Sequence, residues 1–185
     1  MFDHYVTTQA AVRRRVCSQD GDYHSALDDR RGSSPPIEVQ TMKPLPHEYD
    51  VHLTGGPSGY AQLSTSGIPE LRTAPPADYD GPGDAWSPEH LLLASVQTCF
   101  LFTLRAIARL SKLEFTNLAL DATGTVNRQD GVTRFTEIIL RPRLTVVSGT
   151  DHKRALQILD KSEKTCLVTA SLSTPVRLEP EILDE

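Results

Sequence analysis

Apolar and polar residues alternate over 48–54, EYDVHLT, and again over 60–66, YAQLSTS. A two-residue period places successive side chains on opposite faces and is typical of β-strands. The segment GGPSG at 55–59 lies between them and predicts a turn. We therefore expect a β-hairpin here, followed by a long loop over 67–85 that is rich in proline and glycine.

The strongest helical pattern follows this loop and predicts a helix from Pro88 to about Lys112. Ser87 is a favourable N-cap, proline is favoured at the first helical position, and Glu89 complements the helix dipole. The face opposite the main stripe is also apolar as far as Phe102, so we expect a helix at the centre of the fold or in a subunit interface. The main stripe comprises Leu92, Val96, Cys99, Thr103, Ala106 and Leu110.

The C-terminal half alternates between strand and helix patterns. The turn signal RQDG at 128–131 separates two strand-like segments, which predicts a second hairpin. Imperfect alternation around Ile138–Ile139 predicts a bulge in its second strand. A helix capped by Thr150 or Asp151 follows, and then a short helix that carries Cys166. The expected elements are strands over 117–128 and 132–147, a helix over 151–164, a short helix within 165–172 and a strand over 174–182.

The order β-β-α-β-β-α-α-β predicts a mixed α+β domain, which we place at 45–185. Residues 1–44 differ in pattern, because they contain RRR at 13–15 and the breaker cluster GSSPP at 32–36. Their weak periodicity predicts a poorly ordered N-terminal extension. We interpret Cys17 as a bystander thiol in that extension.

Composition narrows the class of protein. A hydrophobic content of 38% and a charged content of 23% are typical of a soluble globular domain. The net charge of −5 gives no indication of a nucleic-acid partner. The apolar run Leu91–Leu104 is short and interrupted by polar residues, so we expect no membrane span. We see no apolar signal segment at the N-terminus, and three cysteines do not suggest a secreted disulfide scaffold, so we expect a cytoplasmic protein.

Cys99 and Cys166 are the residues most able to carry chemistry. On spacing alone both fit inert core thiols, since free cysteine packs as a small hydrophobic residue. The other interpretation is a nucleophile that requires a dry pocket. The six histidines show no ligand spacing with the cysteines, so we expect no zinc or other metal site. Glycine-rich phosphate loops and G-x-S-x-G motifs are also absent from the sequence.

Two motifs together resemble the OsmC/Ohr family of thiol-dependent peroxidases. The first is S-P-E-x-L-L-x-A-x-x-x-x-C-F, which begins at Ser87, and the second is E-x-x-C-L-V-T-x-S-L, which begins at Glu163. Together with the preceding hairpin, the resemblance covers about residues 46–183. It implies an OsmC-like α+β fold with antiparallel sheets around a central buried helix, and an intertwined homodimer. Many relatives have proline after the second cysteine, where this chain has Leu167.

The resemblance also implies a reaction. Cys99 resembles the peroxidatic cysteine, whose thiolate attacks an organic hydroperoxide and becomes a sulfenic acid. Cys166 resembles the resolving cysteine, which condenses with that sulfenic acid to form a disulfide. A dithiol reductant, such as a lipoylated protein, then restores both thiols. No metal or organic cofactor is implied.

Glu89 belongs to the first motif but lies ten residues before Cys99, hence roughly 15 Å along a regular helix. If Glu89 is catalytic, we expect it to serve the site of a partner chain. The other interpretation is that it only complements the helix N-terminus.

The sequence departs from the family at the arginine that stabilises the thiolate. Family members have it in the loop after the first strand or in the loop before the central helix. This chain has GGPSG and PADYDGPG there, without arginine. Arg72 is the nearest substitute and His90 a second, although the more ordinary interpretation of Arg72 is a tethered surface arginine. Phe100 and Phe102 are candidates for an apolar substrate pocket or for a dimer core.

Two other functions remain open from the sequence. One is a non-enzymatic OsmC-like dimer, a stress-associated or binding protein that keeps the fold and lacks the activating arginine. The other is a thiol redox sensor in which oxidation of Cys99 alters the dimer.

Overall fold

A computed structural model describes residues 43–185 of the chain. The predicted extension over 1–44, with Cys17, lies almost entirely outside the described residues and stays a prediction. The chain divides into two compact units, Met1–His47 and Glu48–Glu185, and the second contains every helix and strand described below.

The first sheet has three antiparallel strands, β1 (His52–Gly55), β2 (Ala61–Thr65) and β3 (Ile68–Thr73). The predicted hairpin is confirmed, but β3 lies in the segment that we expected to be a loop. Pro69 obscured this strand in the sequence, and proline is tolerated there because β3 is an edge strand. Gly67, with φ of 75°, forms the tight turn between β2 and β3.

The predicted central helix is confirmed as α1 (Pro88–Ser111). The Ser87 side chain accepts a hydrogen bond from the His90 backbone N–H, and the His90 ring accepts one from the Ser87 backbone N–H. This reciprocal arrangement is a capping box with histidine in place of the usual glutamate. Lys112 ends the helix in the left-handed conformation, with φ of 52°.

The buried face of α1 differs from the predicted stripe. Of the stripe, Val96 is fully buried, whereas Leu110 is 81% exposed. Beyond Val96, the face that packs into the core lies one position further along the chain than the predicted stripe. Its members are Val96, Phe100, Leu104, Ile107 and Ala108.

The second sheet is built on a long hairpin of β4 (Phe115–Gln129) and β5 (Val132–Val146). Asp130 and Gly131 join the strands with φ of 52° and 81°, as a tight hairpin turn requires. The predicted bulge is present, two residues earlier than expected, where Thr125 pairs with Glu137 and the next pair skips Thr136.

The C-terminal strand is split into β6 (Val176–Leu178) and β7 (Glu181–Asp184), where we expected one strand over 174–182. Pro180 lacks a backbone N–H and separates the two. Both strands pair in parallel with β5, so the second sheet is mixed, whereas the first sheet and the β4–β5 pair are antiparallel as expected.

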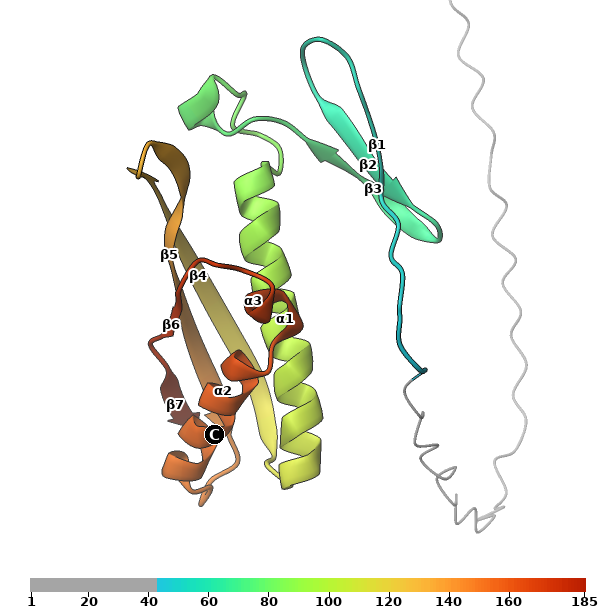
Figure 1. The fold of residues 1–185 in the computed structure, drawn as a ribbon. Coiled ribbons are helices and arrows are strands. Elements are labelled where there is room, and N and C mark those ends of the chain that lie inside the picture. The colour runs from blue at the N-terminus through green and yellow to red at the C-terminus, as the bar shows by residue number, and fades with distance from the viewer. Residues whose placement is uncertain (1–42) are drawn as a thin grey trace, which may run out of the picture. The chain divides into compact units, whose positions relative to one another are not determined.

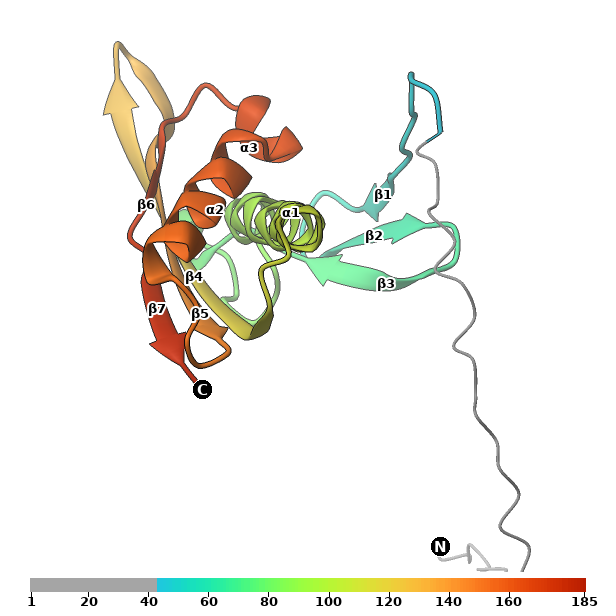
Figure 2. The same ribbon diagram turned by 90° about the horizontal axis from the view of Figure 1, so that it is seen from below.

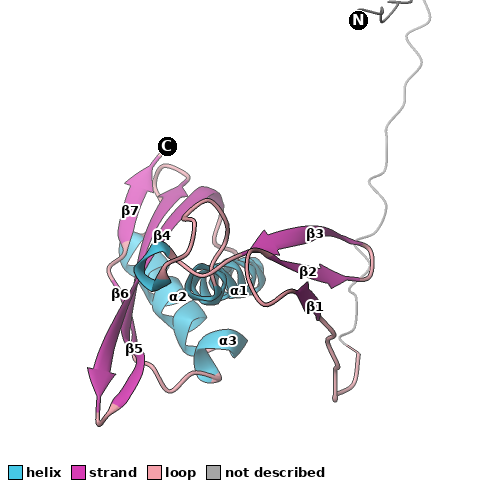
Figure 3. Ribbon diagram, turned by 90° about the horizontal axis from the view of Figure 1, so that it is seen from above, coloured by secondary structure: helices cyan, strands magenta, loops and turns pink. Residues whose placement is uncertain are grey.

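Helices cover one face of this second sheet (Figures 1 and 3). These are α1 and α2 (His152–Lys164), with the short α3 (Leu167–Ala170) beyond α2. Seen along its axis in Figure 2, α1 lies against α2 and β4. A short 3-10 helix, η1 (Ala77–Tyr79), precedes α1. The core joins α1 and α2 to β5, through Phe100, Leu104, Ile138, Leu140, Leu144 and Leu159.

The other face of α1 is apolar but is not covered by residues 43–185, since Phe102 is 59% exposed. Contrary to our expectation, α1 is long and apolar enough to cross a membrane by length and composition alone. The core helix of a soluble protein meets the same criteria, so among the described residues this helix is weak support for a membrane location.

Candidate active site

The structure brings Cys99 and Cys166 together from α1 and α3. Cys166 is the N-cap residue of α3, and the backbone N–H of Val168 points to Cys99 Sγ at 3.5 Å. The Cys166 thiol is within hydrogen-bonding reach of Cys99. Both thiols are free, and Cys166 is 0% exposed whereas Cys99 is partly exposed. The pairing implied by the resemblance is therefore compatible with the fold.

A short turn after α2 creates this geometry. The Cys166 N–H donates to the Glu163 carbonyl, which ends α2, and the Ala170 N–H donates to the Cys166 carbonyl, which begins α3. The first N–H groups of a helix lack partners within it. Here those of Leu167 and Val168 face the sulfur of Cys99.

The electrostatics distinguish the two thiols. Burial alone raises the pKa of Cys99, but hydrogen bonds from Cys166, the Val168 N–H, the Thr103 hydroxyl and the Leu167 N–H outweigh it and leave the pKa below its ordinary value. Burial raises the pKa of Cys166, and its hydrogen bond to Cys99 raises that pKa further. Cys99 therefore ionises first, with the neutral Cys166 thiol as a donor to it.

Cys99 opens into a pocket of about 620 Å³. Its lining is largely apolar and includes no charged side chain. A thiolate at the wall of such a pocket suits a neutral, apolar substrate. The lining residues are Tyr49, Ser95, Thr98, Cys99, Phe102, Thr103, Ala106, Ile107, Leu167 and Val168.

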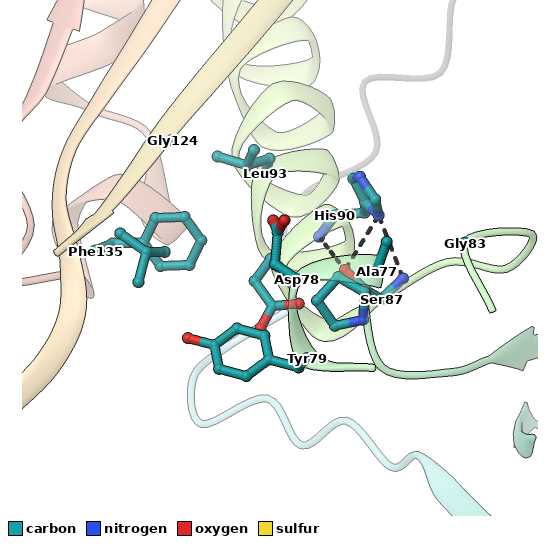
Figure 4. A pocket seen from close by; sticks show the side chains of 12 residues that line it. Ala77, Asp78, Tyr79, Gly83, Ser87, His90, Leu93, Gly124 and Phe135 are labelled. Atoms are coloured by element: carbon teal, nitrogen blue, oxygen red, sulfur yellow. Dashed lines mark hydrogen bonds between the residues drawn. The ribbon is translucent and has the colours of Figure 1, made fainter. Parts of the chain in front are cut away.

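Glu89 and His90 line a different pocket, of about 690 Å³, between η1, the start of α1 and the β4–β5 hairpin. Figure 4 shows Asp78 and Tyr79 of η1 across from Phe135 of β5. One carboxylate oxygen of Glu89, Oε2, is buried without a hydrogen-bond partner among the described residues. A single chain thus keeps Glu89 away from the Cys99 pocket.

Arg72 is held by other groups. Its guanidinium donates to the backbone carbonyl of Asp84 at 3.1 Å, forms an ion pair with the Asp84 carboxylate at 3.4 Å, and lies 4.3 Å from the centre of the Tyr60 ring. Within one chain Arg72 does not line the Cys99 pocket.

Of the four predicted substrate-binding residues, Phe102 lines the Cys99 pocket, whereas Phe100 is fully buried in the core. Sequence reasoning missed the roles of Thr103 and of the backbone at Leu167 and Val168. The signal for Thr103 was its position four residues after Cys99, on the same face of the helix. Backbone donors leave no signal in a sequence.

Among residues 43–185 no group of three or more histidine, cysteine, aspartate or glutamate side chains is arranged to hold a metal ion.

The fold and the cysteine pair can be compared with known proteins. The family model described as OsmC-like protein matches residues 81–181. The chain belongs to the OsmC-like family.

One relative is the uncharacterized protein YmaD of Bacillus subtilis (strain 168). It is 32% identical to this chain over 109 residues, which is 57% of this chain and 73% of YmaD. The similarity to YmaD supports the family assignment, and YmaD is itself described as uncharacterized.

Solved structures support the OsmC-like fold. An OsmC-like protein of unknown function from Vibrio cholerae has a TM-score of 0.67 at 17% identity, and covers 72% of this chain and 99% of its own. An organic hydroperoxide resistance protein OsmC from Legionella pneumophila has a TM-score of 0.59 at 19% identity, and covers 75% and 99%. At these identities the likeness establishes the fold. OsmC/Ohr proteins are commonly dimeric.

Proposed function

We propose that this protein is a thiol-dependent peroxidase that reduces organic hydroperoxides. The observation that carries the proposal is the cysteine pair, with the more acidic thiol, Cys99, at the wall of an apolar pocket. Structural relatives named organic hydroperoxide resistance proteins, from Legionella pneumophila and Elizabethkingia anophelis, support the substrate class. We place the activity in the cytoplasm, where reducing systems keep thiols free.

The proposed chemistry has three steps. The Cys99 thiolate attacks the terminal oxygen of ROOH, the O–O bond breaks, and the other oxygen leaves as ROH, while Cys99 becomes a sulfenic acid. The Cys166 sulfur then attacks the Cys99 sulfur, water leaves, and a disulfide forms. A dithiol, such as a lipoylated protein, reduces the disulfide and is itself oxidised.

Among the described residues of one chain, neutral donors rather than a cation stabilise the thiolate. Four donors around Cys99, namely the Cys166 thiol, the Thr103 hydroxyl and two backbone N–H groups of α3, lower its pKa against the effect of burial. Hydrogen bonds to an ionised group are stronger than neutral ones, at about 1.5–3 kcal/mol each. The donors therefore replace part of the stabilisation that an arginine supplies.

The active form that we propose is an intertwined homodimer. The uncovered face of α1 and the exposed Val51, Leu53 and Ile68 beside or within the first sheet supply apolar surface for a second chain. In this dimer Glu89, whose buried oxygen requires a donor, faces the site of the second chain. Arg72 is the cation and His90 the imidazole that we expect to serve that site.

The test mixes the reduced protein with cumene hydroperoxide and dihydrolipoamide and follows peroxide loss. We expect turnover by the wild type and by Cys17→Ser, which is the matched control. Cys99→Ser should abolish the reaction with peroxide. Cys166→Ser should allow one oxidation per chain and then stop. An inactive wild type rejects the proposed function, and turnover by Cys99→Ser rejects the residue assignment.

A redox sensor is the second candidate, favoured by the lack of a charged side chain in the Cys99 pocket. A sensor is oxidised by peroxide once and is reduced slowly. Its oxidation changes the association of the chains, which sedimentation of the reduced and oxidised forms measures. Rapid turnover with unchanged sedimentation excludes it.

A further inference from the structure

Thr169 carries a buried hydroxyl whose function the proposed peroxide chemistry does not explain. Its Oγ1 has no hydrogen-bond partner among the described residues. Its neighbours are satisfied, since the Thr165 and Ser171 hydroxyls each donate to the carbonyl four residues earlier at 2.8 Å. An orphaned buried hydroxyl costs about 1–3 kcal/mol, so its retention calls for an explanation.

The position of Thr169 indicates what it can bind. It is the third residue of α3, whose N-cap is Cys166, and side chains at these two positions lie next to each other. The neutral Cys166 thiol makes no capping hydrogen bond. The Thr169 hydroxyl and N–H nevertheless lie close enough to Cys166 to lower its pKa, against the larger effects of burial and of Cys99.

We propose that the reductant attacks the Cys99 sulfur of the Cys99–Cys166 disulfide, and that Thr169 stabilises the Cys166 thiolate that leaves. The inference rests on the proposed function, since it concerns the step that regenerates the two thiols. Thr169 is then a positioning residue for the leaving group, and its hydroxyl stabilises the thiolate that forms in that step.

Accessibility selects the sulfur that is attacked. Cys166 is 0% exposed, whereas Cys99 lines the open pocket. Association with a second chain can only add to the burial of Cys166. A thiolate must approach along the S–S axis, and it can do so only from the side of Cys99, which expels Cys166.

The electron balance favours a dithiol over a monothiol as the reductant. One sulfur of the reductant bonds to Cys99, the Cys99–Cys166 bond breaks, and its electron pair leaves on Cys166. With a monothiol, the nearby Cys166 thiolate attacks Cys99 again and expels the reductant. With a dithiol, the second thiol attacks the first reductant sulfur, forms a cyclic disulfide and releases Cys99, after which protons restore both thiols.

The first experiment locates the mixed disulfide. Diamide first oxidises the Cys17→Ser protein to the Cys99–Cys166 disulfide, and excess 2-mercaptoethanol is then added. The reaction is quenched rapidly with acid and N-ethylmaleimide, and the labelled peptides are identified by mass spectrometry. We expect 2-mercaptoethanol on Cys99 and maleimide on Cys166, in at least tenfold excess over the reverse. Equal labelling, the reverse pattern, or failure of diamide to join the two cysteines overturns the inference.

The second experiment measures the rate at which dihydrolipoamide reduces the diamide-made disulfide. Loss of a hydrogen bond to a thiolate predicts about tenfold slower reduction in Thr169→Val. Thr169→Ser keeps the hydroxyl and Thr165→Val is the matched control, so both should stay within about twofold of the wild type. A Thr169→Val rate equal to the wild-type rate, or equal slowing in Thr165→Val, overturns the role of Thr169.

Oxidation by peroxide is followed separately in the same variants. Thr169 is not among the groups that lower the pKa of Cys99, so we expect Thr169→Val to consume its first equivalent of cumene hydroperoxide at the wild-type rate. A purely structural defect would slow both half-reactions, and that result also rejects the assignment. Because diamide makes the disulfide without peroxide, an inactive wild type rejects the proposed function without affecting these measurements.

Discussion

Replacement of Thr103 by valine tests whether neutral donors activate Cys99. Valine has nearly the same shape but cannot donate a hydrogen bond, so the change removes one of the four donors to the sulfur. Since these donors favour the thiolate, their loss raises the pKa of Cys99. A hydrogen bond to a charged group contributes about 1.5–3 kcal/mol, and about 1.4 kcal/mol corresponds to a factor of ten. We therefore expect about tenfold less thiolate at neutral pH.

The assay is the rate of Cys99 alkylation by iodoacetamide as a function of pH, in a Cys17→Ser background, with labelled peptides identified by mass spectrometry. In Thr103→Val the rate should rise at higher pH than in the wild type and reach a similar plateau. Thr98→Val is the control, because the Thr98 hydroxyl lines the same pocket but donates to the Ala94 carbonyl at 2.8 Å. Identical profiles for Thr103→Val and the wild type, or an equal shift in Thr98→Val, would refute the reasoning.

Three further changes test the fold and the dimer. Phe100→Ala empties a fully buried position and should lower the free energy of unfolding in urea by about 3–5 kcal/mol, and a loss below about 1 kcal/mol would contradict its place in the core. Gly131→Ala places a side chain at φ of 81° and should cost about 1 kcal/mol in the same assay, whereas no loss would contradict the turn geometry. Phe102→Glu places a charge on the uncovered face of α1 and should shift sedimentation from dimer towards monomer. Unchanged sedimentation would argue against a dimer built on this face.

Local signals in the sequence located most elements. The Ser87–Pro88 start of α1 and the Asp130–Gly131 turn follow from backbone preferences that act within a few residues, and both were predicted. Errors arose where a distant strand decides the outcome. The strand β3 exists because Leu71 pairs with Leu63, and β6 and β7 are separate because each pairs with a different part of β5. These pairings depend on a partner strand elsewhere in the chain, so the residues of β3, β6 and β7 show no hydrophobic pattern that predicts the pairing.

Some residues of the candidate site could also be predicted from local sequence motifs, whereas others depend on contacts between distant segments. Cys99 and Cys166 could be paired through the resemblance, because their motifs have recognisable spacing. The donors at Leu167 and Val168 could not be predicted, since any residue supplies a backbone N–H and only the docking of α3 on α1 aims it at the sulfur. Phe100 and Phe102 looked alike in the sequence, but they lie on nearly opposite sides of α1, so the first is in the core and the second at the pocket.

The donors around Cys99 carry no net charge, and this has consequences for the reaction. A buried cation costs solvation energy and attracts anions, whereas N–H and thiol donors keep the pocket apolar and suited to neutral hydroperoxides. In the proposed mechanism, the same Cys166 contact that lowers the pKa of Cys99 would also keep the second sulfur beside the sulfenic acid. The Cys166 contact therefore contributes both to activation of the first thiol and to the position of the second, so a change that moves α3 should slow both oxidation and disulfide formation. Thr169→Val, which leaves that contact intact, should separate reduction from both.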